Sequence, residues 1–439
     1  MSILSELSER VPGRVFGPGT PEYDAGSAVF LGPGAPEAVA RPESADEVAA
    51  VVAFAAEART PLAIRSGGHG GLPAEGGVVL DLSCLASISS DGNGRVHVGA
   101  GARWGDVAAA LAPAGRGVSS GDTRDVGVGG LATGGGIGWL VRTHGLTVDA
   151  VREIEVVTAA GAVLTVSDDS HPDLFWALRG GGGNFGVATR FTFETAPVAG
   201  LVGGSIRFEQ SGLGDVLRAW RDITVASPDT LNSSLMVMPA FAPGVPAGPT
   251  LGVALLGTEA ELRAILAPLL DLPSVAEEQL GPVAYGDLLE SAPPGRPPFR
   301  FVGGNGFVPA LTDEFLASVE RAVSTEVPTM ALLRALGGAY RRVDADATPL
   351  AFRDAEALLV LNAILPADAP DEQAAEVQLA LDAPLDFTVG RYGNFTQEYG
   401  DDVVATIYPP ATLDRLRRVK AEFDPGDVFR APHHVAPLD

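Results

Sequence analysis

A histidine at the tip of a glycine-rich loop is the most suggestive chemical feature of the sequence. The loop RSGGHG (65–70) follows the apolar run PLAIR (61–65), which predicts a strand. Small residues let backbone N–H groups approach an anion closely, so this loop could cradle a phosphate without lysines. His69 would then be held against the bound group. Taken by itself, the segment is also typical of a tight turn with a solvated histidine.

A second glycine-rich segment, GVGGLATGGGIG (127–138), contains the G-x-G-x-x-A pattern of a dinucleotide-binding turn. Asp149 stands about 20 residues further on, where the ribose-binding acid of that motif would lie. The motif must open a helix, however, and the glycines from Gly134 to Gly138 would interrupt one. The segment therefore disfavours a Rossmann domain.

The segment GVSSG (117–121) matches the G-x-S-x-G pattern of a serine hydrolase, with His433 or His434 as a conceivable base. That chemistry requires a helix directly after the serine, and the following DTRDVGVGG is typical of a loop. Hydrolysis stays open as a function of a different class. In LRGGGGNFGV (178–187), glycines join a predicted helix to a predicted strand. This hinge could pack against a flat ligand or simply cap the helix.

The elements that must position these loops can be read from the spacing of apolar residues. Ser44 and Glu47 have the spacing of a capping box at the start of a helix over 44–58. Further helices are predicted over 104–111, 171–180 and 411–423. Strands are predicted over 61–65, 77–82, 95–100 and 185–195, with a hairpin over 154–166 that turns at Ala160-Gly161.

Composition bounds the class of protein. The 439 residues are enough for two or three domains, and the net charge of −25 opposes binding to nucleic acid or anionic membranes. We see neither an apolar run long enough to span a membrane nor a secretory signal. Cys84 is the only cysteine, which excludes an internal disulfide and a cysteine metal cage. We expect Cys84 to be a buried small hydrophobe and the protein to be cytoplasmic.

Taken together, these segments resemble the FAD-linked oxidases of the vanillyl-alcohol oxidase superfamily, in the berberine-bridge-enzyme-like branch. The resemblance is carried by the loops above, by HGLTVDAV (144–151) and DLFWALRGGGGNFGV (173–187), and by the tail segments YGNF (392–395), RLRRVKAEFDPGDVFR (415–430) and HHVAP (433–437). It implies an α+β fold with a two-part, PCMH-type FAD-binding domain. Residues 1–199 would form that domain and residues 385–439 would complete it. Residues 200–384 would form a substrate-binding domain, an antiparallel sheet flanked by helices.

The resemblance also implies FAD as the cofactor, attached covalently through His69. Relatives with a second link use a cysteine at the position of Thr123, so a single attachment is implied here. The positions expected to bind the cofactor are those of the glycine loops and a few outside them: His69, Arg65, Ser66, Gly67, Gly68, Gly70, Gly121, Asp122, Val126, Gly127, Gly129, Gly130, Thr133, Gly134, Gly135, Gly138, Gly186, Val187 and Tyr408.

The catalytic groups implied by the resemblance lie in the tail: Tyr392, Asn394 and His434. Tyr392 is the candidate base, and we expect a positive neighbour, Arg342 or His434, to lower its pKa. The usual Y-x-N-Y reads YGNF here, and His434 stands where the family tail usually places an asparagine. Val126 matches a position at which valine tends to admit oxygen to the flavin.

We therefore expect an oxidase that takes a hydride from a small alcohol, sugar-like compound or amine and passes the electrons to molecular oxygen, releasing peroxide. A flavin dehydrogenase or oxidative cyclase that uses another acceptor is the alternative within the enzyme class. The protein would act on a small molecule as a monomer or homodimer, without nucleic acid, membrane or metal.

Overall fold

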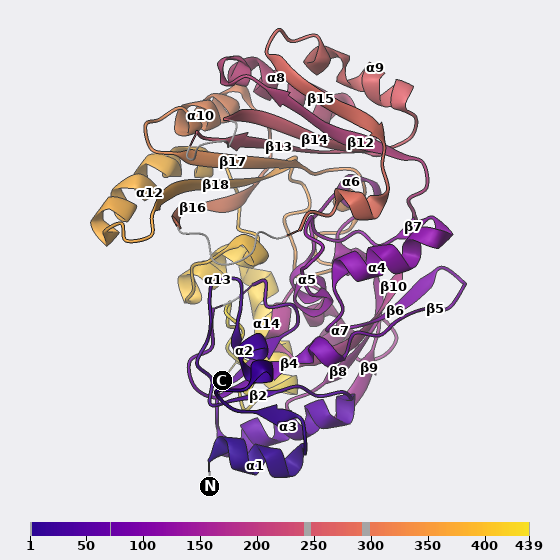
Figure 1. The fold of residues 1–439 in the computed structure, drawn as a ribbon, viewed down its shortest axis with the longest axis vertical. Helices are drawn as coiled ribbons and strands as arrows, with labels where there is room; N and C mark the ends of the chain where they lie inside the picture. Colours follow the sequence, from indigo (N-terminus) through magenta and orange to yellow (C-terminus); the bar gives the residue numbers. More distant parts are fainter. Residues whose placement is uncertain (1, 71, 241–246, 292–298, 439) are drawn as a thin grey trace.

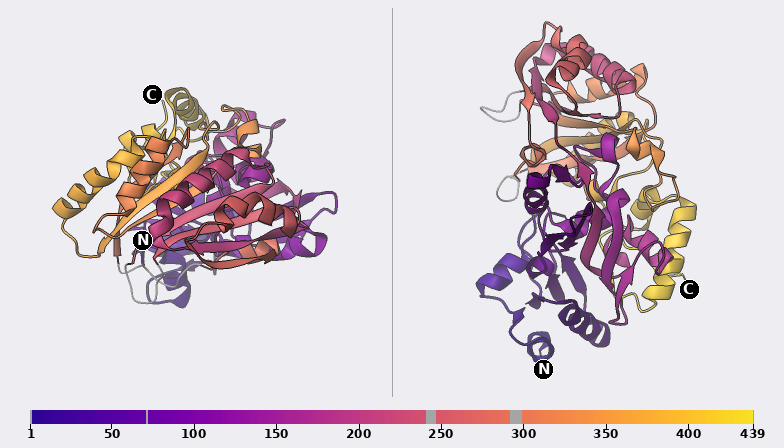
Figure 2. Two further views of the ribbon diagram at one scale, coloured as in Figure 1. Left: turned by 90° about the horizontal axis from the view of Figure 1, so that it is seen from above. Right: turned by 90° about the vertical axis from the view of Figure 1, so that its right-hand side faces the viewer.

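The computed structural model describes residues 2–70, 72–240, 247–291 and 299–438. The chain forms two lobes, one above the other in Figure 1. The lower lobe holds the first part of the chain, and the upper lobe holds a large sheet from the middle of the chain. The tail, yellow in both figures, returns to run along the lower lobe (Figure 2). Residues far apart in the sequence thus form one lobe.

Small sheets form the centre of the lower lobe. One has the order β1-β2-β4-β3, in which β2, β4 and β3 are parallel. A second is antiparallel, with the order β5-β6-β10-β8-β9, and a two-stranded ribbon pairs β11 with β7. The strands are β1 (Val15–Phe16), β2 (Ala38–Ala40), β3 (Leu62–Arg65), β4 (Val78–Asp81), β5 (Ile88–Ser90), β6 (Arg95–Gly99), β7 (Arg116–Gly117), β8 (Val151–Val157), β9 (Val163–Val166), β10 (Val187–Glu194) and β11 (Ala196–Pro197).

Helices from both ends of the chain cover these sheets. From the first part come α1 (Ile3–Arg10), α2 (Pro21–Ser27), α3 (Ala45–Ala58), α4 (Trp104–Leu111), α5 (Val128–Gly134) and α7 (Pro172–Leu178). The short α6 (Val141–His144) instead packs against the upper lobe. The tail contributes α13 (Asp401–Ile407) and α14 (Pro410–Phe423), and α14 packs against α7. Tail residues such as Tyr408 and Leu416 belong to the same apolar core as the two sheets. The tail is therefore an integral part of this lobe.

The upper lobe is one seven-stranded antiparallel sheet of the described residues, in the order β15-β12-β14-β13-β17-β18-β16. Helices cover its outer face, because alternate strand residues such as Leu333 and Leu359 point into a core shared with those helices. The elements are β12 (Leu201–Phe208), α8 (Leu213–Ala226), β13 (Leu231–Met238), β14 (Gly248–Leu256), α9 (Glu259–Leu270), β15 (Val275–Pro282), β16 (Phe299–Val308), α10 (Asp313–Val323), β17 (Thr329–Ala335), α11 (Ala339–Arg342), β18 (Ala357–Pro366) and α12 (Asp371–Leu385).

The other face of the large sheet is turned toward the lower lobe. A separate apolar cluster joins the lobes there and contains Ile137, Phe307, Leu358 and Tyr392. Hydrogen bonds also join the lobes here, because the buried Arg353 donates two of them, of 2.9 and 2.8 Å, to the carboxylate of Asp149. The lobes are therefore held together by a packed interface, which fixes the side chains that meet there.

The predicted fold class, helices with a largely antiparallel sheet structure, is confirmed. The helix at 44–58 begins as expected, because the Ser44 hydroxyl accepts from the Glu47 N–H at 3.2 Å. The Glu47 carboxylate, however, accepts from Glu43 N rather than closing a box on Ser44. The hairpin pairs Val157 with Val163.

The prediction that Cys84 is buried is wrong. Its side chain is exposed. Cys84 ends a short 3₁₀ turn (Leu82–Cys84) after β4, and this turn directs Leu82 into the core and Cys84 outward.

No helix in the described part of the chain is long and apolar enough to cross a membrane. Within the same residues, no group of three or more histidine, cysteine, aspartate or glutamate side chains is arranged to hold a metal ion.

Candidate functional site

The His69 loop begins where β3 ends. The imidazole stacks on the ring of Phe30, with 5.1 Å between centroids and 14° between planes. Its Nε2 atom is buried and has no hydrogen-bond partner among the described residues. Burial lowers the pKa of His69, and the nearby guanidinium of Arg103 lowers it further. The ring is therefore neutral near pH 7, and within the described residues its Nε2 lone pair or N–H is left unpaired.

Arg65 supports this loop from within the protein. Its Nε donates to Ala28 O at 3.0 Å, and its Nη1 donates to the buried carboxylate of Asp81, also at 3.0 Å. Gly68 lies directly over the guanidinium, where an added Cβ would come within 2.8 Å of Arg65 Nη2. Gly68 also has a φ of 68°, which favours glycine. Arg65 thus shapes the loop and has protein partners of its own.

The two glycine loops touch backbone to backbone. A Cβ on Gly67 would lie 2.3 Å from Gly127 N, and a Cβ on Gly127 would lie 2.2 Å from Gly67 N. Arg103 joins them by donating to Gly67 O at 2.9 Å and to Asp125 O. Because only glycine permits this approach, the loops form one rigid unit.

Ser66 adds a second link between the loops. Its hydroxyl donates to Ala100 O at 2.6 Å and accepts from Gly129 N at 3.2 Å. The glycine-rich segment then forms the short helix α5, in which Thr133 donates to Gly129 O. The exposed Gly130 and Gly70 have no atom within 4 Å of where a Cβ would lie. These two glycines border open space next to the joined loops.

The end of the glycine-rich segment, from Gly134 onward, packs closely against the C-terminal tail. An added Cβ on Gly134 would lie 2.2 Å from Asn394 Oδ1, and one on Gly135 would lie 2.9 Å from the ring of Tyr392. On the other side, a Cβ on Gly138 would lie 2.0 Å from Ser120 O. Glycine is needed at these positions because a side chain would clash with the tail on one side and with the backbone at Ser120 on the other.

The Tyr392 hydroxyl is the best-defined polar group at the junction of the lobes. It accepts hydrogen bonds from Gly136 N and from Asn394 Nδ2, both at 2.8 Å. The backbone N–H of Tyr392 donates to Asn305 Oδ1 on β16 at 2.7 Å. Burial raises the pKa of Tyr392 to about 12, and the two donors act in the opposite direction.

The expected positive neighbours of Tyr392 are not where we predicted them. Arg342 pairs with Asp229 at an exposed position. His434 Nε2 lies 2.8 Å from Asp427 Oδ1, in a tail turn where Asp427 also contacts Lys420. Both side chains have carboxylate partners of their own, so neither is directed at the phenol. The expectation of a cation beside Tyr392 is therefore wrong.

Three further positions from the sequence lie in packed surroundings. Tyr408 donates from its hydroxyl to Gly180 O at 3.0 Å and belongs to the core of the lower lobe. Gly186 allows close packing on Val156, where a Cβ would clash at 2.6 Å, and Val187 next to it is also buried in that core.

Val126 is half-buried against the same core, beside Gly127 of the joined loops. Gly121 is buried, and the next residue, Asp122, forms an ion pair with Arg334 of β17. Arg334, Arg103 and Phe30 were not singled out from the sequence. No local motif marks them, since each acts through a contact with a distant segment.

The hydrolase alternative is contradicted. The residues after Ser119 form no helix until α5, and the Ser119 hydroxyl donates to Gly145 O at 2.7 Å. Ser120 instead contacts the Tyr285 hydroxyl at 2.8 Å. His433 lies against Gly393 O at 2.9 Å. Asp149 binds Arg353, so it is a structural residue and not a ribose-binding acid.

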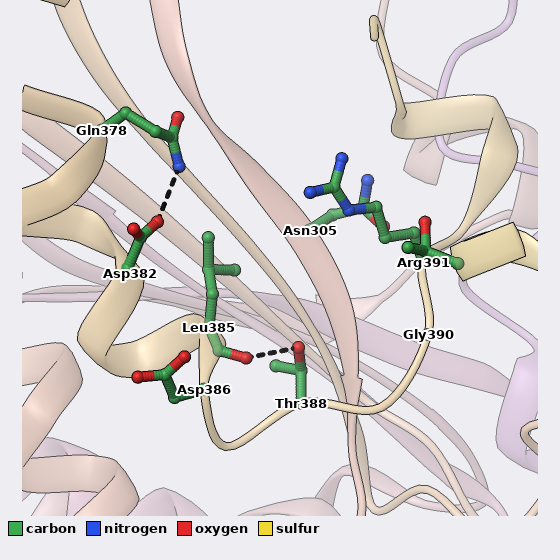
Figure 3. A pocket seen from close by; sticks show the side chains of 9 residues that line it. Asn305, Gln378, Asp382, Leu385, Asp386, Thr388, Gly390 and Arg391 are labelled. Atoms are coloured by element: carbon green, nitrogen blue, oxygen red, sulfur yellow. Dashed lines mark hydrogen bonds between the residues drawn. The ribbon is translucent and has the colours of Figure 1, made fainter. Parts of the chain in front are cut away.

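A surface cavity of about 280 Å³ lies beside the C-terminal end of α12 (Figure 3). Carboxylates of Asp382 and Asp386 face it on one side and Arg391 on the other. Gln378 donates to Asp382, and Arg391 pairs with Glu398. Asn305 connects this cavity to the Tyr392 backbone, but no residue of the glycine loops lines it. It is separate from the candidate site.

Two family models match the chain. One, described as FAD binding domain, matches residues 36–167, and one described as berberine and berberine like matches residues 391–436. These ranges contain the two glycine loops and the Tyr392 segment respectively.

Curated relatives match along nearly the whole chain. An uncharacterised FAD-linked oxidoreductase of Bacillus subtilis (strain 168) is 31% identical over 402 residues, which cover 88% of each chain. The (R)-6-hydroxynicotine oxidase of Paenarthrobacter nicotinovorans is 30% identical over 451 residues, or 97% of each chain. Xylooligosaccharide oxidase of Thermothelomyces thermophilus is 30% identical over 446 residues, covering 93% of this chain and 88% of the relative.

Solved structures of similar proteins share the fold. The 6-hydroxy-D-nicotine oxidase from Arthrobacter nicotinovorans superposes with a TM-score of 0.85 at 28% identity, covering 97% of this chain and 98% of that one. Glucooligosaccharide oxidase from Acremonium strictum, described with a 6-S-cysteinyl, 8α-N1-histidyl FAD, gives a TM-score of 0.85 at 22% identity and 99% coverage of both chains.

Proposed function

The chain belongs to the FAD-linked oxidoreductases of the vanillyl-alcohol oxidase superfamily, in the berberine-bridge-enzyme-like branch, and from this membership we propose that it is an oxidase with FAD bound covalently to His69. The protein is thus an FAD-dependent enzyme. We further propose a single covalent attachment of FAD, a small alcohol, sugar-like or amine substrate, and molecular oxygen as the electron acceptor. Its main support is the imidazole of His69, which has a lowered pKa and a buried ring nitrogen with no hydrogen-bond partner in the part of the chain that the structure describes.

The residues around His69 fit a flavin nucleotide. The joined loops offer backbone N–H groups without bulky side chains, which suits a pyrophosphate. Gly70 and Gly130 leave open space beside them. A neutral imidazole has a lone pair available for bonding to carbon, so His69 would hold the cofactor, and Thr123 in place of a cysteine supports a single attachment. Bound FAD supplies the hydride acceptor and the reaction with oxygen.

Tyr392 would accept the proton that the substrate loses. Its hydroxyl accepts two hydrogen bonds, and both stabilise the phenolate form that can take up a proton. Asn394 would position the hydroxyl by one of those bonds. His434 was expected to join this group, but its contact with Asp427 gives it a role in holding the tail.

The reaction can be tested with purified holoprotein and a panel of small alcohols, sugars and cyclic amines. We expect hydrogen peroxide to form with at least one class, because the family relatives are named as oxidases of xylooligosaccharides and of 6-hydroxynicotine. Reduction of a dye acceptor without peroxide formation would instead identify a dehydrogenase. A product with a new ring would identify an oxidative cyclase.

Val126 gives a prediction about the electron acceptor. It is a small side chain, half-buried, beside the loop contact at Gly127. Replacing it with leucine adds one methylene, which fills a gap of that size in a packed interior. We expect the photoreduced Val126→Leu variant to be reoxidised by air about ten-fold more slowly than the wild type, an effect worth roughly 1.4 kcal/mol.

Absorbance of the flavin during reoxidation measures this rate. Val163→Leu is the matched control, since Val163 is exposed on β9, away from the loops, and should leave the rate unchanged. Equal reoxidation rates for Val126→Leu and the wild type would show that oxygen does not reach the flavin past this side chain.

A further inference from the structure

Arg334 is a buried arginine on the inner face of the large sheet. Its neighbours in β17, Leu333 and Ala335, belong to the core under the helices, so alternation directs Arg334 to the opposite face, toward the lower lobe. Only 4% of its side chain is exposed. Arginine is rarely buried to this extent unless its donors are paired.

Its main partner comes from the lower lobe. Arg334 Nη2 donates to Asp122 Oδ2. Arg334 Nη1 and Asp122 Oδ1 are both buried, and neither has a hydrogen-bond partner among the described residues. Buried polar atoms are normally satisfied, so this donor and acceptor side by side indicate a missing polar ligand.

Trp139 adds an aromatic surface to the pair. The guanidinium lies over its ring at 4.8 Å from the centroid. The ring packs on Gly252 of β14, where a Cβ would come within 2.5 Å of it. Trp139 Nε1 is likewise buried without a partner in the part of the chain that the structure describes. The group therefore offers two donors and one acceptor.

The pair lies close to the Tyr392 hydroxyl. Gly136 N donates to that hydroxyl, and two residues later a Cβ on Gly138 would lie 2.9 Å from Gly121 O, directly before Asp122. One short segment thus separates the Asp122 loop from Tyr392. In agreement, the negative charge of Asp122 contributes to the raised pKa of Tyr392.

We propose that Asp122 and Arg334 form the anchor for a neutral polyhydroxylated substrate, such as a sugar, during the oxidation proposed above. A substrate hydroxyl would donate to Asp122 Oδ1, and the same or the adjacent hydroxyl would accept from Arg334 Nη1.

The charges at the pair favour this class of ligand. A carboxylate would bind Arg334 but face the negative charge of Asp122, and Glu290 is near enough to raise the pKa of Asp122. An amine cation would bind Asp122 but face Arg334. A hydroxyl both donates and accepts, and so it satisfies both atoms without adding charge.

The test compares the holoprotein with Asp122→Asn and Arg334→Met. The probes are xylobiose and D-glucose as neutral sugars, D-glucosamine as a cation and D-glucuronate as an anion, with dye reduction as the assay. We expect turnover of a neutral sugar in the wild type and a rise in its KM of about 10- to 100-fold in each variant, because one charge-assisted hydrogen bond is lost. The kcat should fall by less than about five-fold, since the contact is made equally before and during hydride transfer.

The exposed pair Asp215–Arg218 on α8 provides the matched controls Asp215→Asn and Arg218→Met, which should leave KM unchanged. Flavin content and thermal unfolding identify a variant that fails to fold, and Asp122→Asn, which keeps the side-chain volume, then carries the test. An unchanged KM in a folded, flavin-loaded Asp122→Asn would overturn the proposal. So would a wild-type preference for the amine or the acid. A wild type that oxidises no alcohol, sugar or amine at all would instead contradict the proposed function.

Discussion

The Tyr392→Phe variant should be reduced by substrate about 10²- to 10⁴-fold more slowly than the wild type, the usual contribution of a positioned proton-transfer group. The change removes one hydroxyl and keeps the ring, which packs against Phe307 and Phe395. Flavin binding should therefore be retained. The KM should move much less than the rate, because proton transfer acts mainly in the transition state. Anaerobic stopped-flow reduction measures the rate.

The pH dependence of the same reaction provides an independent check. Burial raises the pKa of Tyr392 to about 12, so the phenol is protonated across the neutral range. Only the phenolate can accept a proton, and its fraction grows ten-fold with each pH unit below that value. The wild-type rate of flavin reduction should therefore rise with pH through the neutral and mildly alkaline range. In Tyr392→Phe this rise should be absent.

The phenol at position 399 offers a matched control. Tyr399 is half-buried and stacks on His433, outside the hydrogen bonds of the Tyr392 hydroxyl. Tyr399→Phe should leave the rate and its pH profile unchanged. If Tyr392→Phe were reduced at nearly the wild-type rate, Tyr392 would not be the base, and the carboxylate of Asp122 would be the next group to examine.

The His69→Ala variant should lose the covalent bond to flavin completely while keeping part of the bound FAD. The reason is that the contacts between the glycine loops involve Ser66, Gly67 and Arg103 and do not depend on the imidazole. After acid precipitation, the flavin of the wild type should stay in the protein pellet. The flavin of His69→Ala should appear in the supernatant.

His97→Ala is the matched control for this experiment. His97 lies on β6, where its Nδ1 is 3.0 Å from Thr192 Oγ1, away from the loop. Its flavin should remain in the pellet. Free FAD in the wild-type supernatant would contradict covalent attachment, although the protein would still be an FAD enzyme.

Several elements could be predicted from local patterns because their causes are local. Ser44 starts α3 through a hydrogen bond to a residue three positions away. The hairpin β8–β9 turns where Gly161 adopts a φ of 77°, a conformation that glycine takes readily. The short helix α5 ends at Gly134, as the glycines that follow it require. Cys84 was misplaced because an apolar run does not show which way a turn directs its last side chain.

The candidate site could be predicted only in part. The His69 loop is marked by its own sequence, and its resemblance to a family identifies the histidine. The surroundings of Tyr392 are different, because its partners Gly136 and Asn305 come from segments 256 and 87 residues away. The cations expected there, Arg342 and His434, were chosen by type alone, and each has a nearer carboxylate.

The sequence by itself determined the family, the cofactor class and the glycine loops, since each depends on residue types at short spacing. Only the tertiary structure decided which polar groups meet where the lobes join. Asp122 and Arg334 are separated by 212 positions in the chain, and no periodicity links a loop of one lobe to a strand of the other. Their pairing follows from the antiparallel order of the large sheet and from the packed interface around Tyr392. Long-range packing of this kind places side chains that have no local signal.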